Sequence, residues 1–478
     1  MKKVILLIAA LFFVVAAALA QAENKSDVTI SGDSDGNSVV VKQEQEDNEL
    51  NVSQVDILDN SDGNIVDIKQ KGEALESEVR IDGGSGENEV EISQDGEDSR
   101  SDVEIAGNSD ENLVDVSQDG DDNESDVGIG NGSDDNLVDV EQFGENHDSD
   151  VDISDFSDGN DVFVDQDGGH NDSEVDIYNN SDDNLVEVSQ VGDDNDSDVK
   201  IGGGSDENLV DVSQDGEDNE SDIEIAGNSD ENMVDVSQDG EDNSSDVEID
   251  GGSNENMVDV SQEGDDNNSD VEIDDKSDKN LVEVEQDGSD NQSDVEIDGG
   301  SDENMVDVSQ DGDDNESVVD ISDHSDENLA EVEQDGEGHS SNIDISNYSE
   351  DNEVYIDQQD EDNESYVTIE RGDDNFISVN QEDEDQYSKV EIFNRSDRNN
   401  INVYQEGEDQ FSEIILGNGS DDNFVTIDQD GEGHFSFVEI LNNSINNIIS
   451  IQQDGYNSSS TVSIDGASNN NIVRIIQR

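Results

Sequence analysis

The chain has 478 residues, of which 135 are Asp or Glu and 17 are Lys or Arg, so its formal net charge is -118. It contains no Cys, Pro or Trp, which excludes disulfide bonds and thiolate metal sites. A chain this acidic and this poor in aromatic residues is typical of disorder unless its residue pattern indicates otherwise, and its charge opposes binding to nucleic acid.

The first 22 residues have the pattern of a secretory signal peptide. Lys2 and Lys3 precede an apolar run from Val4 to Ala20, and Ala20-Gln21-Ala22 has the small-x-small form of a cleavage site. No other long apolar stretch follows, so we do not expect a transmembrane protein. Residues 1–22 are therefore predicted to direct export and to be removed.

The rest of the chain repeats one phrase. Nineteen copies start at Ser26 and end at Gln477, and 16 of the 18 steps between copies are 24 residues long. Ser101, Asn112 and Gln118 mark positions that stay Ser, Asn and Gln in all 19 copies, while the residues between them vary. A disordered acidic tail has no reason to preserve such positions, so residues 23–478 are predicted to form one repeat domain without a linker.

The spacing of the apolar residues within a copy indicates strands. Val103 and Ile105, and then Val114 and Val116, alternate with polar residues, and this period of two in β-branched residues is the pattern of a strand. The intervening segments are rich in Gly, Asn, Asp and Ser, which favour turns. Two such strands cannot form a core alone, so the fold class is all-β. We predict a β-solenoid of 19 stacked strand-turn-strand-turn coils with two parallel sheets.

The invariant polar residues share the parity of the core residues, so they are predicted to point inward or to lie at the sheet margin. Buried amides need hydrogen bonds, and identical amides stacked one coil apart can supply them to each other. The predicted structural ladder includes Ser101, Asn112, Gln118, Ser125, Asn136, Gln142, Asn208, Gln214, Asn304, Gln310, Asn471 and Gln477.

This pattern resembles the curlin repeats of curli fibre subunits from Gram-negative bacteria. Those repeats follow Ser-x5-Gln-x4-Asn-x5-Gln-x4-Asn, and this chain has Ser101-x5-Gly107-x4-Asn112-x5-Gln118-x4-Asn123. Four of the five landmarks match in spacing, and the repeat pattern runs through all 19 copies. The first Gln is replaced, usually by Gly or Asn, which predicts that one inner ladder is missing.

The resemblance implies an exported subunit that self-associates outside the cell into functional amyloid fibres. Such fibres support the biofilm matrix and cell adhesion. The implied partners are other copies of the chain, a nucleator and an outer-membrane secretion machinery of the curli type. The implied location is the extracellular space or cell surface of a Gram-negative bacterium.

The acidic residues lie at outward positions and in the turns, at about six net negative charges per coil. Coils spaced by about 4.8 Å then carry more charge per unit length than duplex DNA, which already condenses counterions. We therefore expect counter-cations, salt or acid pH to be needed for folding and assembly.

The recurrent turn at Asp119-Gly120-Asp121-Asp122 raises the possibility of calcium binding, because Ca²⁺ prefers carboxylate oxygens. The turn lacks the terminal bidentate Glu of an EF-hand. A solvated acidic turn is the alternative interpretation, and no cofactor is otherwise predicted.

The C-terminal coils at 442–478 differ from the others. The only charged residues in 441–478 are two Asp and two Arg. Of the 16 aromatic residues after residue 22, 12 lie in the segment from Tyr348 to Tyr456. The last predicted strand presents an apolar edge, and open edges template strand pairing. The candidate assembly edge consists of Ile472, Val473, Ile475 and Ile476; the alternative is that neutral coils only stabilise this end.

No motif indicates an enzyme. The five His residues occur at scattered turn offsets, whereas a metal or catalytic site needs convergence, and carboxylates are too frequent to identify one. Two classes of function remain. One is the fibre-forming structural subunit; the other is a soluble monomeric acidic β-solenoid that binds calcium, other cations or a surface.

Overall fold

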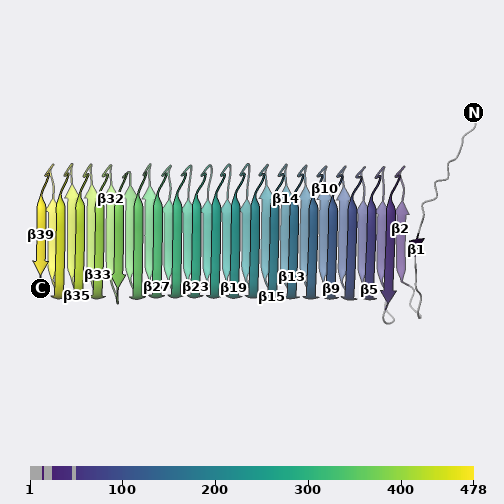
Figure 1. Ribbon diagram of the computed structural model, residues 1–478, viewed down its shortest axis with the longest axis horizontal. Coiled ribbons are helices and arrows are strands. Elements are labelled where there is room, and N and C mark those ends of the chain that lie inside the picture. The colour runs from purple at the N-terminus through teal and green to yellow at the C-terminus, as the bar shows by residue number, and fades with distance from the viewer. Residues whose placement is uncertain (1–12, 15–23, 46–49) are drawn as a thin grey trace, which may run out of the picture. The chain divides into compact units, whose positions relative to one another are not determined.

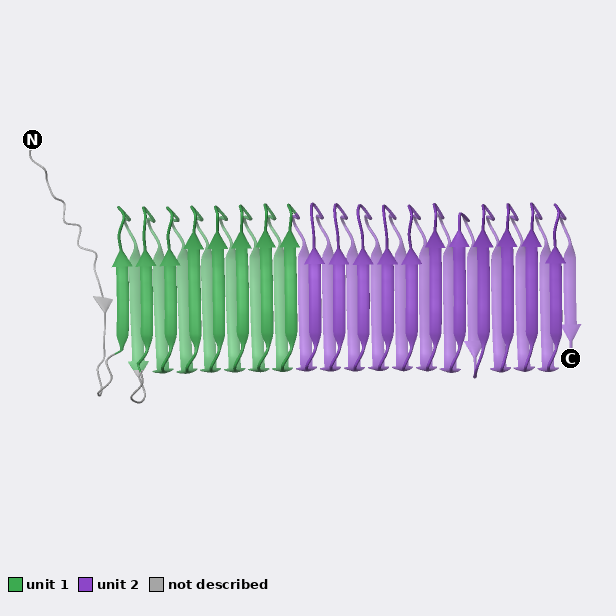
Figure 2. Ribbon diagram, turned by 180° about the vertical axis from the view of Figure 1, so that it is seen from behind, with its two compact units in different colours: residues 1–204 green, residues 205–478 purple. Residues whose placement is uncertain are grey.

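Short Val- and Ile-rich segments form parallel strands along the chain, as the ribbon in Figure 1 shows. A computed structural model of the protein describes residues 13–14, 24–45 and 50–478. These form two compact units, Met1–Gly204 and Ser205–Arg478, which are coloured separately in Figure 2. The even-numbered strands of each unit form one parallel sheet, called the B sheet here, and the odd-numbered strands form the other, the A sheet.

The first unit contains β1 to β16. Its B sheet consists of β2 (Lys25–Ile30), β4 (Val52–Ile57), β6 (Glu76–Ile81), β8 (Arg100–Ala106), β10 (Glu124–Gly130), β12 (Asp148–Ser154), β14 (Asp172–Tyr178) and β16 (Asp196–Gly202). Its A sheet consists of β1 (Phe13–Val14), β3 (Ser38–Gln45), β5 (Ile65–Glu73), β7 (Glu89–Glu97), β9 (Leu113–Asp121), β11 (Leu137–Glu145), β13 (Asp161–Gly169) and β15 (Leu185–Asp193).

The second unit contains β17 to β39. Its A sheet consists of β17 (Leu209–Glu217), β19 (Met233–Glu241), β21 (Met257–Asp265), β23 (Leu281–Ser289), β25 (Met305–Asp313), β27 (Leu329–Glu337), β29 (Glu353–Glu361), β31 (Phe376–Glu382), β33 (Asn400–Glu408), β35 (Phe424–Glu432), β37 (Ile448–Tyr456) and β39 (Ile472–Gln477). Its B sheet consists of β18 (Glu220–Ile225), β20 (Ser244–Ile249), β22 (Asn268–Ile273), β24 (Gln292–Ile297), β26 (Glu316–Ile321), β28 (Ser340–Ser346), β30 (Glu364–Glu370), β32 (Tyr387–Phe393), β34 (Phe411–Gly417), β36 (Phe435–Leu441) and β38 (Ser459–Ile464).

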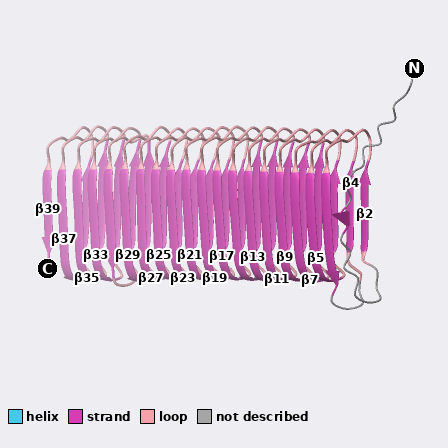
Figure 3. Cartoon of the chain, turned by 45° about the vertical axis from the view of Figure 1, so that its right-hand side comes forward, coloured by secondary structure: helices cyan, strands magenta, loops and turns pink. Residues whose placement is uncertain are grey.

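Within each unit, strands pair with their equivalents one repeat away, so that equivalent residues lie side by side. Val114 of β9 is opposite Val138 of β11, and Val103 of β8 is opposite Val127 of β10. The predicted all-β solenoid with two parallel sheets and about 19 turns is confirmed. Strands and connecting loops alternate along the chain in Figure 3. The part of the chain that the structure describes contains no helix, and hence none able to cross a membrane.

The core lies between the two sheets of each unit. Val103 and Ile105 from the B sheet, and Val114 and Val116 from the A sheet, are fully buried. The residues between them face outward, so each strand alternates buried and accessible positions. Packing of β-branched side chains from both sheets is the main apolar contribution to stability.

The turns depend on left-handed backbone conformations. Asn108, Glu111 and Asp122 have φ values of 67°, 61° and 58°. Gly120 has φ 139°, and a Cβ there would lie 1.8 Å from the carbonyl oxygen of Gly144 in the next coil. Glycine is therefore favoured at this register of the A sheet, although Asp360 occupies it in β29.

Of the signal peptide predicted at 1–22, only Phe13 and Val14 are described, and they pair with Val40 and Val41 of β3. The other residues lie outside the described part, so the signal peptide remains a prediction. The single repeat domain over 23–478 also remains a prediction.

Candidate functional site

The invariant asparagines stack into a hydrogen-bonded column inside each unit. The Nδ2 of Asn136 donates to Oδ1 of Asn112 at 3.0 Å, and its backbone N–H donates to the same oxygen at 2.9 Å. Asn112 donates in turn to Asn88 at 3.1 Å and to the carbonyl of Ser133 at 2.9 Å. Each amide thereby satisfies its donors and its acceptor inside the core.

The invariant glutamines form a second column of opposite direction. Gln118 Nε2 donates to Gln142 Oε1 at 2.8 Å, and Gln142 donates to Gln166 at 2.9 Å. Asparagine side chains thus donate to the preceding coil, whereas glutamine side chains donate to the following coil. The two columns give each coil chemically different faces, one toward lower and one toward higher residue numbers.

The same contacts occur in the second unit. Asn208 accepts from Asn232 at 3.1 Å, and Asn304 donates to Asn280 at 3.1 Å. Gln214 donates to Gln238 at 2.9 Å, and Gln310 donates to Gln334 at 2.8 Å. Close to the end of the chain, Asn471 donates to Asn447 at 2.8 Å, and Gln477 accepts from Gln453 at 2.7 Å.

The serines at the start of each repeat behave differently from the prediction. Ser101 and Ser125 are buried and stack in register, but their hydroxyls have no hydrogen-bond partner. A few equivalents, such as Ser77, instead donate to a glutamine of the other column. The serines therefore fill a narrow part of the core, and their hydroxyls bond to one another only in some pairs, such as Ser341 to Ser317 and Ser412 to Ser388, both at 3.2 Å.

A further serine column was not identified from the sequence. Ser109 is fully buried, its hydroxyl donates to the carbonyl of Ala106 at 2.9 Å, and it accepts from the backbone N–H of Ser133 at 3.2 Å. This column lies near Gly107, the position where the resemblance predicts a missing ladder. The recurrence of serine at the position of Ser109 in nearly every copy was the available sequence evidence.

A second asparagine column runs through Asn123 and its equivalents, which are also buried. Asn243 Nδ2, for example, donates to Asn219 Oδ1 at 3.1 Å. His147, His339 and His434 replace asparagine in this column and are buried as well. The expectation that the histidines occupy scattered turn positions is therefore wrong for these three, because the turn folds this position into the core.

The contacts of His339 define its tautomer. Its Nδ1 accepts the backbone N–H of Asn363 at 3.3 Å, while its Nε2 lies 3.3 Å from the carbonyl oxygen of Asp335 and donates to it. The ring is thus neutral, with its proton on Nε2. Burial lowers the pKa of His339, and the same cause lowers the pKa of His147.

Carboxylates form rows on the outer faces of the sheets. On the B sheet of the first unit, Asp102, Asp126 and Asp150 are neighbours in adjacent strands. Partial burial, followed by the charges of neighbouring carboxylates, raises the pKa of Asp102 and Asp150 to about 6. Asp172 has the same shift for the same reasons. These rows are the part of the surface where cations or protons relieve repulsion.

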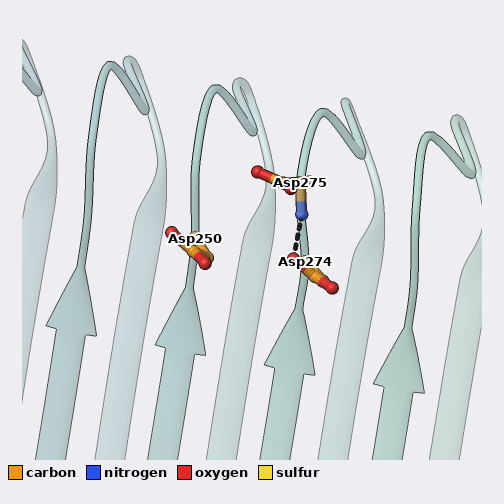
Figure 4. Close-up of side chains that lie close together, drawn as sticks. All are labelled: Asp250, Asp274 and Asp275. Carbon is orange, nitrogen blue, oxygen red and sulfur yellow. Dashed lines mark hydrogen bonds between the residues drawn. The ribbon is translucent and has the colours of Figure 1, made fainter.

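Three carboxylates of the second unit converge in Figure 4. Oxygens of Asp250, Asp274 and Asp275 lie within 4.8 Å of one another, and the backbone N–H of Asp275 donates to Asp274. This cluster lies in the turn after a B-sheet strand, whereas calcium was predicted in the turns equivalent to Asp119–Asp122. Since Ca²⁺ takes six to eight oxygens, three carboxylates offer only part of a coordination shell, and calcium binding remains a prediction.

The candidate assembly edge is β39. It pairs with β37 through Ile472 and Ile448, and no strand in the described ranges pairs with its other edge. Ile472 is 77% exposed and Ile476 is 44% exposed. Val473 and Ile475 point toward the core but are only half-buried, whereas their equivalents in β37 are fully buried.

These features define a parallel β-solenoid whose coils are joined by buried polar columns. The family described as the curlin associated repeat matches residues 134–168, which include Asn136, Gln142, Ser149, Asn160 and Gln166. The match supports a curlin-repeat assignment for this segment of the chain. Curlin repeats build structural proteins that typically lie outside the cell. Comparison with curated proteins gives no match.

Proposed function

We propose that the protein is an exported structural subunit of curli-like extracellular amyloid fibres that support the biofilm matrix and cell adhesion. The observation that carries this proposal is β39, an apolar strand with one paired and one unpaired edge in the described structure. Such an edge accepts a strand from another chain. Self-association through it would extend the same cross-strand pattern from one subunit to the next.

The direction of the amide columns supports joining of unlike ends. Asn471 and Gln477 of the last coil offer an amide oxygen and an amide N–H, respectively, toward a following coil. Asn37 and Gln43 of the first described coil offer the reverse, an amide N–H and an amide oxygen. Phe13 and Val14 pair with Val40 and Val41 of β3, so removal of the predicted signal peptide would free this edge. Stacking β39 of one copy against β3 of another would then continue both columns, whereas joining two like ends would oppose acceptor to acceptor and donor to donor.

Export and location rest on the predicted signal peptide and on the curlin repeat. We infer secretion to the surface of a Gram-negative bacterium, through a curli-type secretion machinery and with a nucleator as partner. We infer a structural and not a catalytic role, since His147, His339 and His434 are engaged in contacts inside the core.

The role of the β39 edge in fibre growth is tested by introducing charged side chains there. Replacing Ile472 and Ile476 by Lys should suppress fibre growth, because lysine on an edge strand blocks pairing. Ile448→Lys is the matched control, since Ile448 is opposite Ile472 in β37, is 45% exposed and does not lie at the edge. Thioflavin fluorescence and electron microscopy follow the fibres. Equal growth of both variants, or of a chain lacking residues 442–478, would contradict the proposal.

The second candidate is a soluble monomeric acidic solenoid that binds calcium or other cations. The convergence of Asp250, Asp274 and Asp275 favours it. Sedimentation of the purified chain distinguishes the two functions: a species that stays monomeric in salt and calcium, without fibres, supports the second.

A further inference from the structure

Four aromatic side chains form a continuous ridge on the outer face of the B sheet in the second unit. The ridge consists of Tyr366, Tyr387, Phe411 and Phe435, one from each of β30, β32, β34 and β36. The ring centroids of Tyr387 and Phe411 are 4.9 Å apart with an interplanar angle of 3°. Those of Phe411 and Phe435 are 5.1 Å apart at 6°, and those of Tyr366 and Tyr387 are 5.6 Å apart at 38°.

The ridge is not needed for coil stacking. Strands elsewhere in the same sheet carry polar residues where Tyr387, Phe411 and Phe435 lie: the equivalent position is Ser244 in β20, Gln292 in β24 and Ser459 in β38. Those strands pair in the same register. Coil stacking in this sheet therefore does not depend on an aromatic residue at this position. Phe435 also remains 39% exposed.

The surroundings of the ridge are also less acidic than strands β20, β22 and β24 of the same sheet. The two central outward positions of β20, β22 and β24 are all Asp or Glu, as in Asp246 and Glu248. In β32, β34 and β36 the same positions are Lys389, Glu391, Glu413, Ile415, Phe437 and Glu439. Lys389 pairs with Glu391 at 2.6 Å. Over these three consecutive coils, Lys389, Ile415 and Phe437 thus lie where β20, β22 and β24 carry carboxylates, and three glutamates remain.

We propose that the aromatic ridge is a lateral docking surface for a second copy of this chain, ridge against ridge about a two-fold axis. The charge pattern selects this occupant. Two chains with a net charge of -118 repel each other wherever acidic rows face acidic rows, and the ridge interrupts those rows. Ridges with the same ring spacing can also pack side by side, with the exposed ring edges of one copy against the rings of the other.

The contact is small. Four partly exposed rings with Ile415 and Phe437 cover less than the roughly 800 Å² per partner of a standard interface. One ridge pair should therefore be weak in solution, while fibres that present one ridge per subunit should associate side by side through many weak contacts. The bundling of fibres rests on the proposed function; the pairing of free chains does not.

The test replaces three ridge residues by serine: Tyr387→Ser, Phe411→Ser and Phe435→Ser. The matched control is Phe376→Asn with Phe424→Asn, which removes two aromatic residues from the A sheet at a register where Asn400 already lies between them. Neither set changes the net charge. Circular dichroism verifies that both variants keep the strand content of the parent.

Sedimentation equilibrium in salt then measures pairing of the soluble chain, and electron microscopy measures bundle width wherever fibres form. The ridge variant should pair at least about tenfold more weakly, a loss of about 1.4 kcal/mol, and should give single filaments. The control should match the parent. If fibres never form but pairing is still lost in the ridge variant, the inference stands and the fibre function fails. Equal pairing and equal bundling of parent and ridge variant, or a parent that neither pairs nor bundles, would overturn the inference.

Discussion

Gln238 shows what a single rung of a polar column contributes. Its Nε2 donates to Gln262 Oε1 at 2.9 Å and to the carbonyl of Glu220 at 3.0 Å, and its Oε1 accepts from Gln214. The substitution Gln238→Glu removes both donated bonds and places a carboxylate beside two buried oxygens. We expect it to destabilise the fold by about 3 kcal/mol, measured by urea unfolding and by hydrogen exchange of the neighbouring coils.

The control for this substitution is the adjacent residue. Ser237 faces outward, and Glu285 occupies the same register two coils later. Ser237→Glu adds the same charge outside the core, so its effect should stay within about 0.5 kcal/mol. If Ser237→Glu lowered the stability as much as Gln238→Glu, the added charge, and not the loss of the buried amide, would be the cause.

The buried histidines make a second residue-level prediction. Because burial lowers the pKa of His339 below the usual value of a free histidine, the unfolded chain takes up a proton more readily than the folded chain. The site's contribution to stability is therefore present above about pH 6.5 and declines as the pH falls through that value. The nearby charges of Asp335, Asp360 and Asp362 oppose this shift without reversing it.

His339→Asn restores the asparagine found elsewhere in the column and removes the titrating group. Between about pH 7.5 and about pH 5, the variant should lose less stability than the parent in urea unfolding. Phe143→Asp, which keeps His339 and adds an exposed carboxylate of the kind found at this register in Asp119 and Asp167, serves as the control for an unrelated surface change. A pH profile of His339→Asn identical to that of the parent would contradict the assignment.

Residues in the strands could be placed from the sequence, and residues in the turns could not. Strict alternation locates Val103, Asn112 and Gln118 in the core because successive side chains of a strand point to opposite faces. Ser109 and Asn123 lie beside Asn108 and Asp122, whose positive φ values break that alternation. Their burial depends on the turn geometry, which composition alone does not determine. Parity likewise placed Ser101 in the core but gave no information on partners for its hydroxyl.

At the scale of the strand, the sequence predicted which residues pair more accurately than where each strand ends. The repeat length fixes which residues lie side by side, since a step of 24 residues brings Val114 opposite Val138. However, β9 continues past Gln118 to Asp121, beyond the alternating segment. The extension is possible because Gly120 adopts φ 139° and allows the carbonyl of Gly144 to approach. In the sequence, the recurring glycine is the only sign of this close approach between two backbones.

The carboxylate rows give a prediction at this scale. Partial burial and neighbouring charges such as that of Asp126 raise the pKa of Asp150 to about 6, so the folded chain holds its proton more tightly than the unfolded chain. Stability from this site is complete below the pKa of a free Asp and is lost as the pH rises through about 6. Asp150→Asn should consequently stabilise the fold at neutral pH and have little effect near pH 4.

Asp135→Asn is the control, because Asp135 lies in an exposed turn and not in a row. Unfolding in urea at several pH values compares the two substitutions. If Asp150→Asn destabilised the chain at neutral pH, or if Asp135→Asn stabilised it equally, repulsion along the row would not be the cause. Acidification thus acts in two directions: it strengthens the sheets through their carboxylate rows and weakens the coils that contain buried histidines.

For the molecule as a whole, repulsion between its negative charges opposes folding. The net charge of -118 is distributed over about 19 coils, and with strands about 4.8 Å apart this is denser than the one charge per about 1.7 Å of duplex DNA. Most of the cationic residues after residue 23 lie before Ser101 or after Glu370, so repulsion is greatest between these positions. Neither the buried columns nor the apolar core reduces it.

We therefore expect strand content to fall when salt is removed at neutral pH and to return when salt or acid is added. Circular dichroism during titrations with NaCl, MgCl₂ and CaCl₂ measures this dependence. Screening acts through ionic strength, so Mg²⁺ and Ca²⁺ should act at similar concentrations, both below that of Na⁺. A much lower midpoint for Ca²⁺ than for Mg²⁺ would instead indicate specific coordination, for which Asp250, Asp274 and Asp275 offer oxygens. Strand content that is equally high without salt would show that the coils tolerate their repulsion unaided, and would contradict the prediction.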